Sequence, residues 1–193
     1  MNIQELKDLQ PLVYQQFVTI LEQGRLAHAY LFSGDFASFE MALFLSQALF
    51  CQEKVGVLPC GKCRSCRLIE SNDFSDVTIV APQGNFIKTD TIRELVKNFS
   101  QSGFESSQQV FIIRDAEKMH VNAANSLLKV IEEPQSTIHI FLLTNQEEAV
   151  LPTIKSRTQI ISFPQNLPYL ERFLEEEGLL KTQASLIARL VSS

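Results

Sequence analysis

The sequence lacks any hydrophobic run long enough to cross a membrane, which takes about 20 apolar residues. Its opening segment, MNIQELKDLQPLVYQQ, is polar and lacks the apolar stretch of a signal peptide. Positive charge is not in excess either, because the formal net charge is −5 at pH 7. The protein as a whole should therefore not attract nucleic acid, although a local basic patch inside a larger assembly could contact DNA. We expect a cytoplasmic globular protein.

Cysteine is absent everywhere except in one segment, CQEKVGVLPCGKCRSC, which spans residues 51–66. The four cysteines are Cys51, Cys60, Cys63 and Cys66. Four thiolates at about 2.3 Å satisfy a tetrahedral Zn²⁺, and each Cys-x-x-Cys unit can direct two sulfurs to one ion. Disulfides or unrelated buried thiols are the alternatives, and a reducing cytoplasm disfavours disulfides. We predict a structural zinc module, because four protein ligands leave no open position for catalysis.

Short apolar strands alternate with helices along most of the chain. Strands are predicted at about 29–33 and from residues 76, 109, 138 and 158. Helices are predicted over 11–23, 38–50 and 89–99, and from residue 122. This alternation is typical of an α/β fold, a parallel sheet with helices on both faces. A ligand crevice is expected at the carboxyl ends of the strands, near Gly34, Arg114 and Asn145.

The pattern changes after Pro164. The segment PYLERFLEEEGLLKTQASLIARLVSS predicts two short helices and no strand. We therefore expect a main domain over residues 1–165 and the beginning of a helical domain over residues 166–193.

The segment YLFSGDFASFEM has the strand–glycine–helix outline of a phosphate-binding loop but lacks its lysine. After Gly34, the lysine position holds Glu40 and the hydroxyl position holds Met41. A carboxylate repels phosphate, and Arg114-Asp115 stands where a Mg²⁺-binding acid pair is required. This chemistry favours a strand, a turn and a buried helix over nucleotide binding. The alternative is an unusual ATPase that binds nucleotide through backbone contacts alone.

One arginine stands out near the end of the predicted sheet. The segment LPTIKSRTQII places Ser156 and Arg157 just before the last strand. An arginine at a domain edge can act as an arginine finger, which supplies charge to a phosphoryl-transfer site in a neighbouring subunit. It can equally form an ordinary surface salt bridge, and the residues alone favour that interpretation.

Four segments, taken in order, resemble the clamp-loader family of AAA+ proteins that serves bacterial DNA polymerase III. They are GRLAHAYLFSG, the cysteine segment, NAANSLLKVIEEP and LPTIKSR. The resemblance covers about residues 10–164, and the helical tail is similar to the beginning of the family's lid domain. It implies an AAA+ P-loop-type sheet of five parallel strands, flanked by helices and carrying a zinc module. It also implies that the family's helical collar domain, which builds a pentamer, is absent from this chain.

The resemblance gives several residues an expected role. The four cysteines match the family's zinc module, and residues 34–41 match its Walker A loop without the lysine found in the ATP-hydrolysing gamma/tau subunits. Arg114 falls on the Walker B aspartate, Asp115 on the glutamate and Asn145 near the sensor-1 position. Ser156 and Arg157 match a Ser-Arg-Cys motif whose arginine points into an adjacent subunit's ATP site. Thr158 replaces the motif's cysteine, which should leave the charge of Arg157 intact.

The resemblance therefore implies a non-hydrolysing subunit of the DNA-directed DNA polymerase holoenzyme that binds structural zinc but no ATP. Its expected partners are gamma/tau and delta subunits and, through the assembly, the sliding clamp and primed DNA. We do not expect this chain alone to assemble. A competing interpretation is a zinc module that binds nucleic acid directly. Its basic residues are Lys54, Lys62, Arg64 and Arg67. The acidic net charge and the lack of interleaved aromatic residues weaken that alternative.

Overall fold

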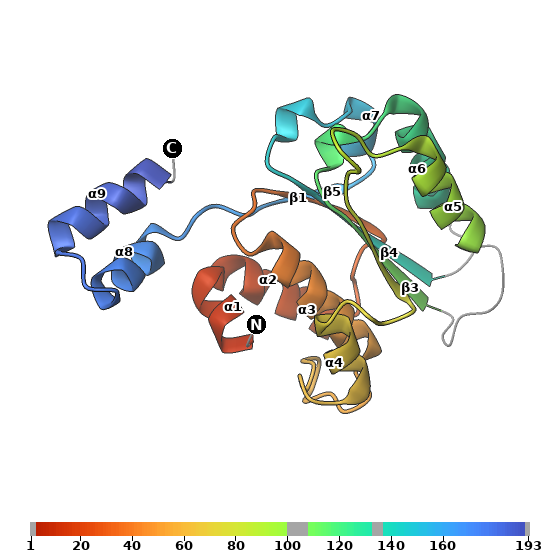
Figure 1. Ribbon diagram of the computed structural model, residues 1–193. Coiled ribbons are helices and arrows are strands. Elements are labelled where there is room, and N and C mark those ends of the chain that lie inside the picture. Colours follow the sequence, from red (N-terminus) through yellow and green to blue (C-terminus); the bar gives the residue numbers. More distant parts are fainter. Residues whose placement is uncertain (1–2, 100–107, 133–136, 192–193) are drawn as a thin grey trace.

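The computed structural model describes residues 3–99, 108–132 and 137–191 (Figure 1). Its centre is a sheet of five parallel strands in the order β2-β3-β4-β1-β5. The strands are β1 (Ala29–Ser33), β2 (Val77–Val80), β3 (Gln108–Ile113), β4 (Thr137–Thr144) and β5 (Gln159–Ser162). The predicted five-stranded parallel sheet is confirmed, and β1 lies inside it with β4 on one side and β5 on the other.

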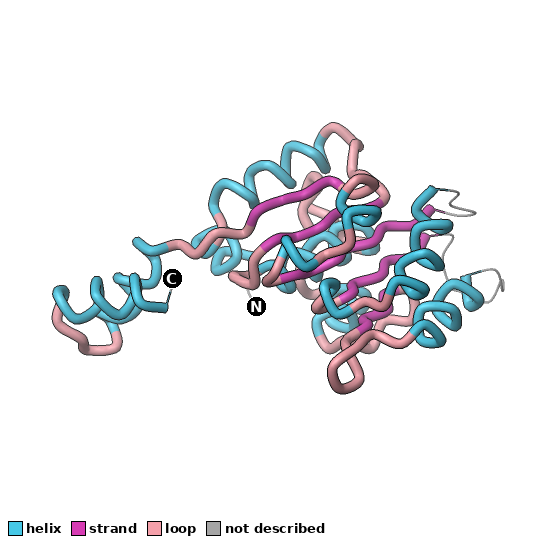
Figure 2. The backbone as a smooth tube through the Cα atoms, turned by 90° about the horizontal axis from the view of Figure 1, so that it is seen from above, coloured by secondary structure: helices cyan, strands magenta, loops and turns pink. Residues whose placement is uncertain are grey.

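Helices cover both faces of this sheet (Figure 2). Successive side chains of β1 point to opposite faces, so Leu31 packs into one core and Tyr30 and Phe32 into the other. The first core is closed by α5 (Thr89–Phe99), α6 (Val121–Glu132) and α7 (Pro152–Lys155). The second is closed by α1 (Ile3–Leu9), α2 (Pro11–Glu22), α3 (Ser38–Phe50) and α4 (Arg64–Glu70). None of the described helices has the length and apolar character that a membrane crossing needs.

Helix α3 follows the glycine turn after β1, and each of its residues is buried or half-buried. Met41 and Leu45 are fully shielded from solvent, and the helix is apolar on nearly all sides. A helix of this kind is stable only inside a core, where its whole surface finds apolar neighbours. The prediction of a buried helix over 38–50 is confirmed. Its first turn begins after Ala37, whose backbone is left-handed with φ of 62°.

Three short helices were not predicted from the sequence: α1, α4 and the four-residue α7. Helix α1 precedes the first predicted helix, and α4 lies partly within the cysteine segment, which has no helical hydrophobic repeat. Each buries a small set of side chains, among them Leu6 in α1 and Ile69 in α4. Helices of seven residues are marginal on their own, so tertiary contacts stabilise them rather than an amphipathic pattern.

The last two helices, α8 (Leu167–Glu176) and α9 (Lys181–Val191), pack against each other and stand apart from the sheet (Figure 1). The predicted helical tail is confirmed, and the domain boundary near residue 165 stays a prediction. Asn166 begins α8: its Oδ1 accepts a hydrogen bond from the backbone N–H of Tyr169 at 3.2 Å. Its Nδ2 donates to the backbone oxygens of Asp8 and Leu9, which joins α8 to the end of α1.

Candidate functional site

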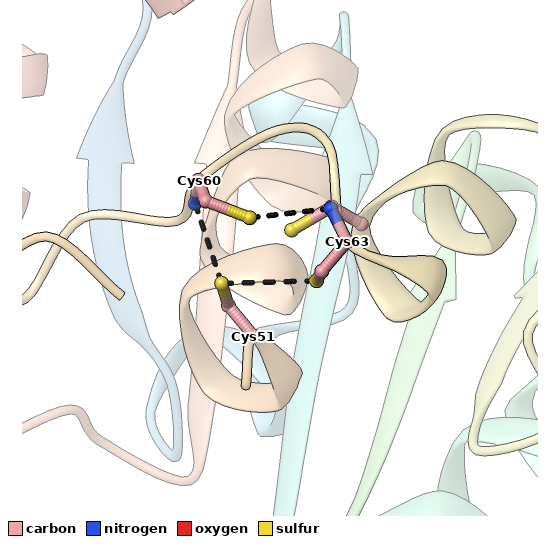
Figure 3. A group of neighbouring side chains, drawn as sticks. Cys51, Cys60 and Cys63 are labelled. Atoms are coloured by element: carbon pink, nitrogen blue, oxygen red, sulfur yellow. Dashed lines mark hydrogen bonds between the residues drawn. The ribbon is translucent and has the colours of Figure 1, made fainter. Parts of the chain in front are cut away.

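The four cysteines converge on one point beside the carboxyl end of α3 and the amino end of α4. Figure 3 shows three of them, Cys51, Cys60 and Cys63. Their sulfur atoms all lie within 4.8 Å of one another, and the Cys51 and Cys63 sulfurs are 3.9 Å apart. Sulfurs at the corners of a tetrahedral zinc site are separated by about 3.8 Å, whereas a disulfide requires about 2.05 Å. All four cysteines are free thiols. The cluster therefore has the spacing of a metal site and not of a disulfide.

Backbone amides donate hydrogen bonds to two of these sulfurs. The N–H of Cys60 donates to the Cys51 sulfur at 3.3 Å, and the N–H of Cys63 donates to the Cys60 sulfur at 3.2 Å. Burial raises the pKa of Cys63, but backbone hydrogen bonds from Cys66 and Gln52, together with neighbouring thiols, lower it to about 6. Burial, followed by the adjacent Cys63, raises the pKa of Cys66. Clustered thiolates repel one another, so a bound cation would satisfy this donor set.

The turn after β1 packs tightly against two other segments of the chain. Gly34 has φ of 109°, and a Cβ atom there would lie 2.4 Å from the backbone oxygen of Phe163. Its N–H donates to the oxygen of Thr144 at 2.8 Å, at the carboxyl end of β4. Glycine is required here because both the backbone angle and the close approach exclude a side chain. The turn is therefore packed between the ends of β4 and β5.

Side chains occupy the positions where phosphate and magnesium chemistry would be needed. Glu40 at the lysine position is half-buried in the first turn of α3, and Met41 at the hydroxyl position lies in the core. The Arg114 guanidinium lies over the ring of Phe39, 5.0 Å from its centroid, in a cation–π contact. The two loops predicted to have lost nucleotide chemistry thus contact each other directly.

Asp115 and Asn145 are the remaining predicted residues at the carboxyl ends of the strands. Asp115 has a left-handed backbone and forms an ion pair with Lys118 at 3.4 Å. Asn145 is exposed, one residue beyond the end of β4. Glu117, which the sequence analysis did not single out, accepts a hydrogen bond from the Thr144 hydroxyl at 2.7 Å. This bond ties the loop after β3 to the end of β4.

Gln10 is a further residue that the sequence analysis missed. Its side chain is 3 % exposed, and its Nε2 donates to the backbone oxygens of Phe36 at 2.8 Å and Pro164 at 2.7 Å. One amide thus joins the turn before α3 to the segment that leads into α8. No local pattern signals this role, because the partners lie 26 and 154 residues away in sequence.

We expect Gln10→Ala to lower the free energy of unfolding by roughly 2–4 kcal/mol, because two carbonyl oxygens lose their donor. Urea denaturation of the chain measures this change. Gln16→Ala is the matched control, since Gln16 is an exposed glutamine on α2. Equal stability of the two variants would contradict the role assigned to Gln10.

Arg157 and the turn that contains Gly34 lie at opposite ends of the parallel strands. Arg157 follows α7 and precedes β5, whereas Gly34 follows β1, and the two strands are parallel neighbours. The length of β1, roughly 15 Å, separates these two ends. The side chain is 39 % exposed and forms an ion pair with Glu132 at the end of α6. Arg157 therefore lies away from the turn that contains Gly34.

Thr158, which departs from the expected Ser-Arg-Cys motif, forms no hydrogen bond with the Arg157 guanidinium in the described part of the chain. Its hydroxyl donates to the oxygen of Ile154 at 3.1 Å and closes the turn after α7. The substitution thus leaves Arg157 with its charge and its hydrogen-bond donors.

Comparison with known proteins places this geometry in a family. Residues 9–166 match the sequence profile described as DNA polymerase III, delta subunit. The DNA polymerase III subunit delta′ of Bacillus subtilis is 38 % identical over 98 % of this chain and 58 % of its own length. The gamma/tau subunit of Mycobacterium bovis is 33 % identical over 85 % of this chain and 30 % of its own length. The chain thus spans about half the length of the first of these curated relatives and less than half the length of the second.

A solved structure supports the fold. A DNA polymerase III gamma subunit-related protein from Thermotoga maritima aligns with a TM-score of 0.57 and 24 % identity, covering 90 % of this chain and 57 % of its own. The five-stranded α/β architecture expected from the AAA+ resemblance is thereby confirmed. The chain belongs to the DNA polymerase III delta subunit family, the clamp-loader AAA+ family of the delta-prime subunits.

Proposed function

We propose that the chain is a non-hydrolysing part of a clamp loader, which places a sliding clamp on primed DNA during replication. One observation carries the proposal: the loop that would hold ATP lacks the side chains that bind phosphate and Mg²⁺. Glu40 and Met41 replace the groups that bind phosphate and Mg²⁺, and Arg114 packs on Phe39 beside them. A subunit built in this way contributes to ATP turnover through another subunit's site.

Arg157 is the group through which it would contribute. The side chain is partly exposed at the amino end of β5, beside the end of α7. The turn that contains Gly34 lies at the other end of the strands. A guanidinium stabilises the charge that spreads over the phosphate oxygens in the transition state of phosphoryl transfer. We assign the receiving ATP site to a gamma/tau neighbour, since gamma/tau subunits are among the curated relatives.

The metal that we assign to the cysteine cluster is a structural Zn²⁺. Cys51, Cys60, Cys63 and Cys66 would supply all four ligands, so the ion holds the end of α3 against α4. With no open coordination position, it supplies no Lewis acid chemistry to a substrate.

The remaining partners follow from this role. We propose a delta subunit as a further member of the assembly, contact with the sliding clamp and primed DNA through the assembly, and a cytoplasmic location. The curated relatives are subunits of DNA polymerase III, which supports an assembled rather than an independent function.

Calorimetric titration with Mg-ATP tests the non-hydrolysing role. We expect no binding in the micromolar range, because Glu40 repels phosphate and Arg114 stands where the Mg²⁺ ligand is required. A gamma/tau subunit titrated under the same conditions is the positive control. Micromolar binding of Mg-ATP by the chain would contradict this proposal and favour a genuine ATPase.

A further inference from the structure

The guanidinium of Arg157 forms hydrogen bonds within its own chain. Nε donates to the Glu132 carboxylate, while Nη1 donates to the backbone oxygen of Thr153 at 3.2 Å and to the Ser156 hydroxyl at 3.3 Å. Thr153 and Ser156 belong to the same short turn as Arg157. Glu132 does not, since it ends α6 and lies 25 residues earlier in sequence.

These contacts leave one side of the guanidinium open. Nε and Nη1 have partners, whereas no hydrogen bond in the described part of the chain involves Nη2. The side chains of Arg157 and Glu132 are 39 % and 48 % exposed, so the pair lies at the surface. An approaching phosphate can therefore meet Nη2 while Glu132 keeps Nε.

We propose that Glu132 is a positioning residue for Arg157: it fixes the guanidinium plane so that Nη2 faces a neighbouring subunit's phosphate. This inference rests on the proposed arginine finger. The planar guanidinium has donors in fixed directions, so a carboxylate at Nε determines where the other donors point. The backbone oxygen at Nη1 supports the same orientation.

Positioning of this kind acts on the rate of phosphoryl transfer. A flexible arginine samples many rotamers and must be ordered at each turnover, whereas an anchored one starts near its productive geometry. Misplacement of a catalytic group by about 1 Å can reduce a rate by about 10²-fold. Glu132 also neutralises part of the positive charge of Arg157 before assembly. Because Glu132 binds Nε, Arg157 need not release it when Nη2 binds a phosphate.

The test measures ATP turnover in a clamp-loader assembly that carries Glu132→Ala. We expect kcat at the adjacent site to fall by about 10- to 100-fold, with KM for ATP little changed, because the neighbour binds the nucleotide. Glu132→Gln retains an acceptor for Nε and should recover part of the loss. Glu148→Ala is the matched control, since Glu148 is an exposed acid near α7 that pairs with Lys155 and not with Arg157.

Two further measurements separate this inference from the proposed function. In the isolated chain, the Nε–H proton of Arg157 should exchange with solvent faster in Glu132→Ala than in the unaltered protein, as NMR can measure. In the assembly, Glu132→Ala combined with Arg157→Ala should turn over ATP no more slowly than Arg157→Ala alone.

Several results would overturn the positioning role. One is unchanged or increased turnover in Glu132→Ala when Arg157→Ala is impaired. Another is unchanged Nε–H exchange in the isolated chain. If Arg157→Ala itself has normal turnover, the arginine finger fails, and the exchange measurement still decides whether Glu132 orients Arg157.

Discussion

Arg157→Ala is expected to lower ATP turnover at the adjacent site of the clamp-loader assembly by about 10³-fold or more. The guanidinium would stabilise negative charge that develops on the transferring phosphoryl group, and alanine leaves that charge without a partner. Because the neighbour holds the nucleotide, the loss should be in kcat rather than in the affinity for ATP. Single-turnover hydrolysis in the presence of the clamp and primed DNA measures the affected site.

Two controls sharpen this experiment. Arg157→Lys keeps a positive charge but loses the planar fork of donors, so an intermediate rate is expected. Lys155→Ala removes a nearby positive charge that pairs with Glu148 at 3.9 Å, and it should leave turnover unchanged. Normal clamp-dependent turnover in the Arg157→Ala assembly would eliminate the arginine finger.

Cys66→Ser should abolish stoichiometric zinc binding and destabilise the chain. The Cys66 side chain is fully buried in α4, and its sulfur is one of four that lie within 4.8 Å. Structural zinc contributes binding energy directly to folding, so loss of one ligand should remove several kcal/mol of stability. At about 2–4 °C per kcal/mol for a chain of this size, we expect Tm to fall by roughly 10 °C or more.

Metal analysis and thermal unfolding measure the two halves of this prediction. The unaltered chain should contain one zinc ion per molecule, and a chelator should lower its Tm toward that of Cys66→Ser. Arg64→Ser is the control, because Arg64 is an exposed residue in the same helix. A Cys66→Ser chain with full zinc content and normal Tm would exclude the four-cysteine site.

The sequence predicted well those features that depend on local pattern. Strand β1 and helix α3 are predominantly apolar, which predicted a strand and a buried helix in an α/β fold. Glu40 and Met41 allowed a loss of phosphate chemistry to be predicted, because a phosphate-binding loop needs specific residues at fixed spacing. The cysteine cluster was predicted for the same reason, since two overlapping Cys-x-x-Cys units direct their sulfurs to one point.

Long-range contacts escaped the sequence analysis. Gln10 bonds to Pro164, Arg114 packs on Phe39, and Glu132 binds Arg157. Each pair is far apart along the chain, and no hydrophobic period or motif connects its members. Such contacts depend on the strand order, which places β1 between β4 and β5 and is itself a non-local property.

The most direct test of the account is a double-mutant cycle of ATP turnover between two subunits. One change is Arg157→Ala in this chain, and the other replaces the lysine of the neighbour's phosphate-binding loop with alanine. If Arg157 acts on the neighbour's nucleotide, Arg157→Ala should have no further effect once that lysine is gone. An Arg157→Ala effect of equal size in both backgrounds would contradict the account.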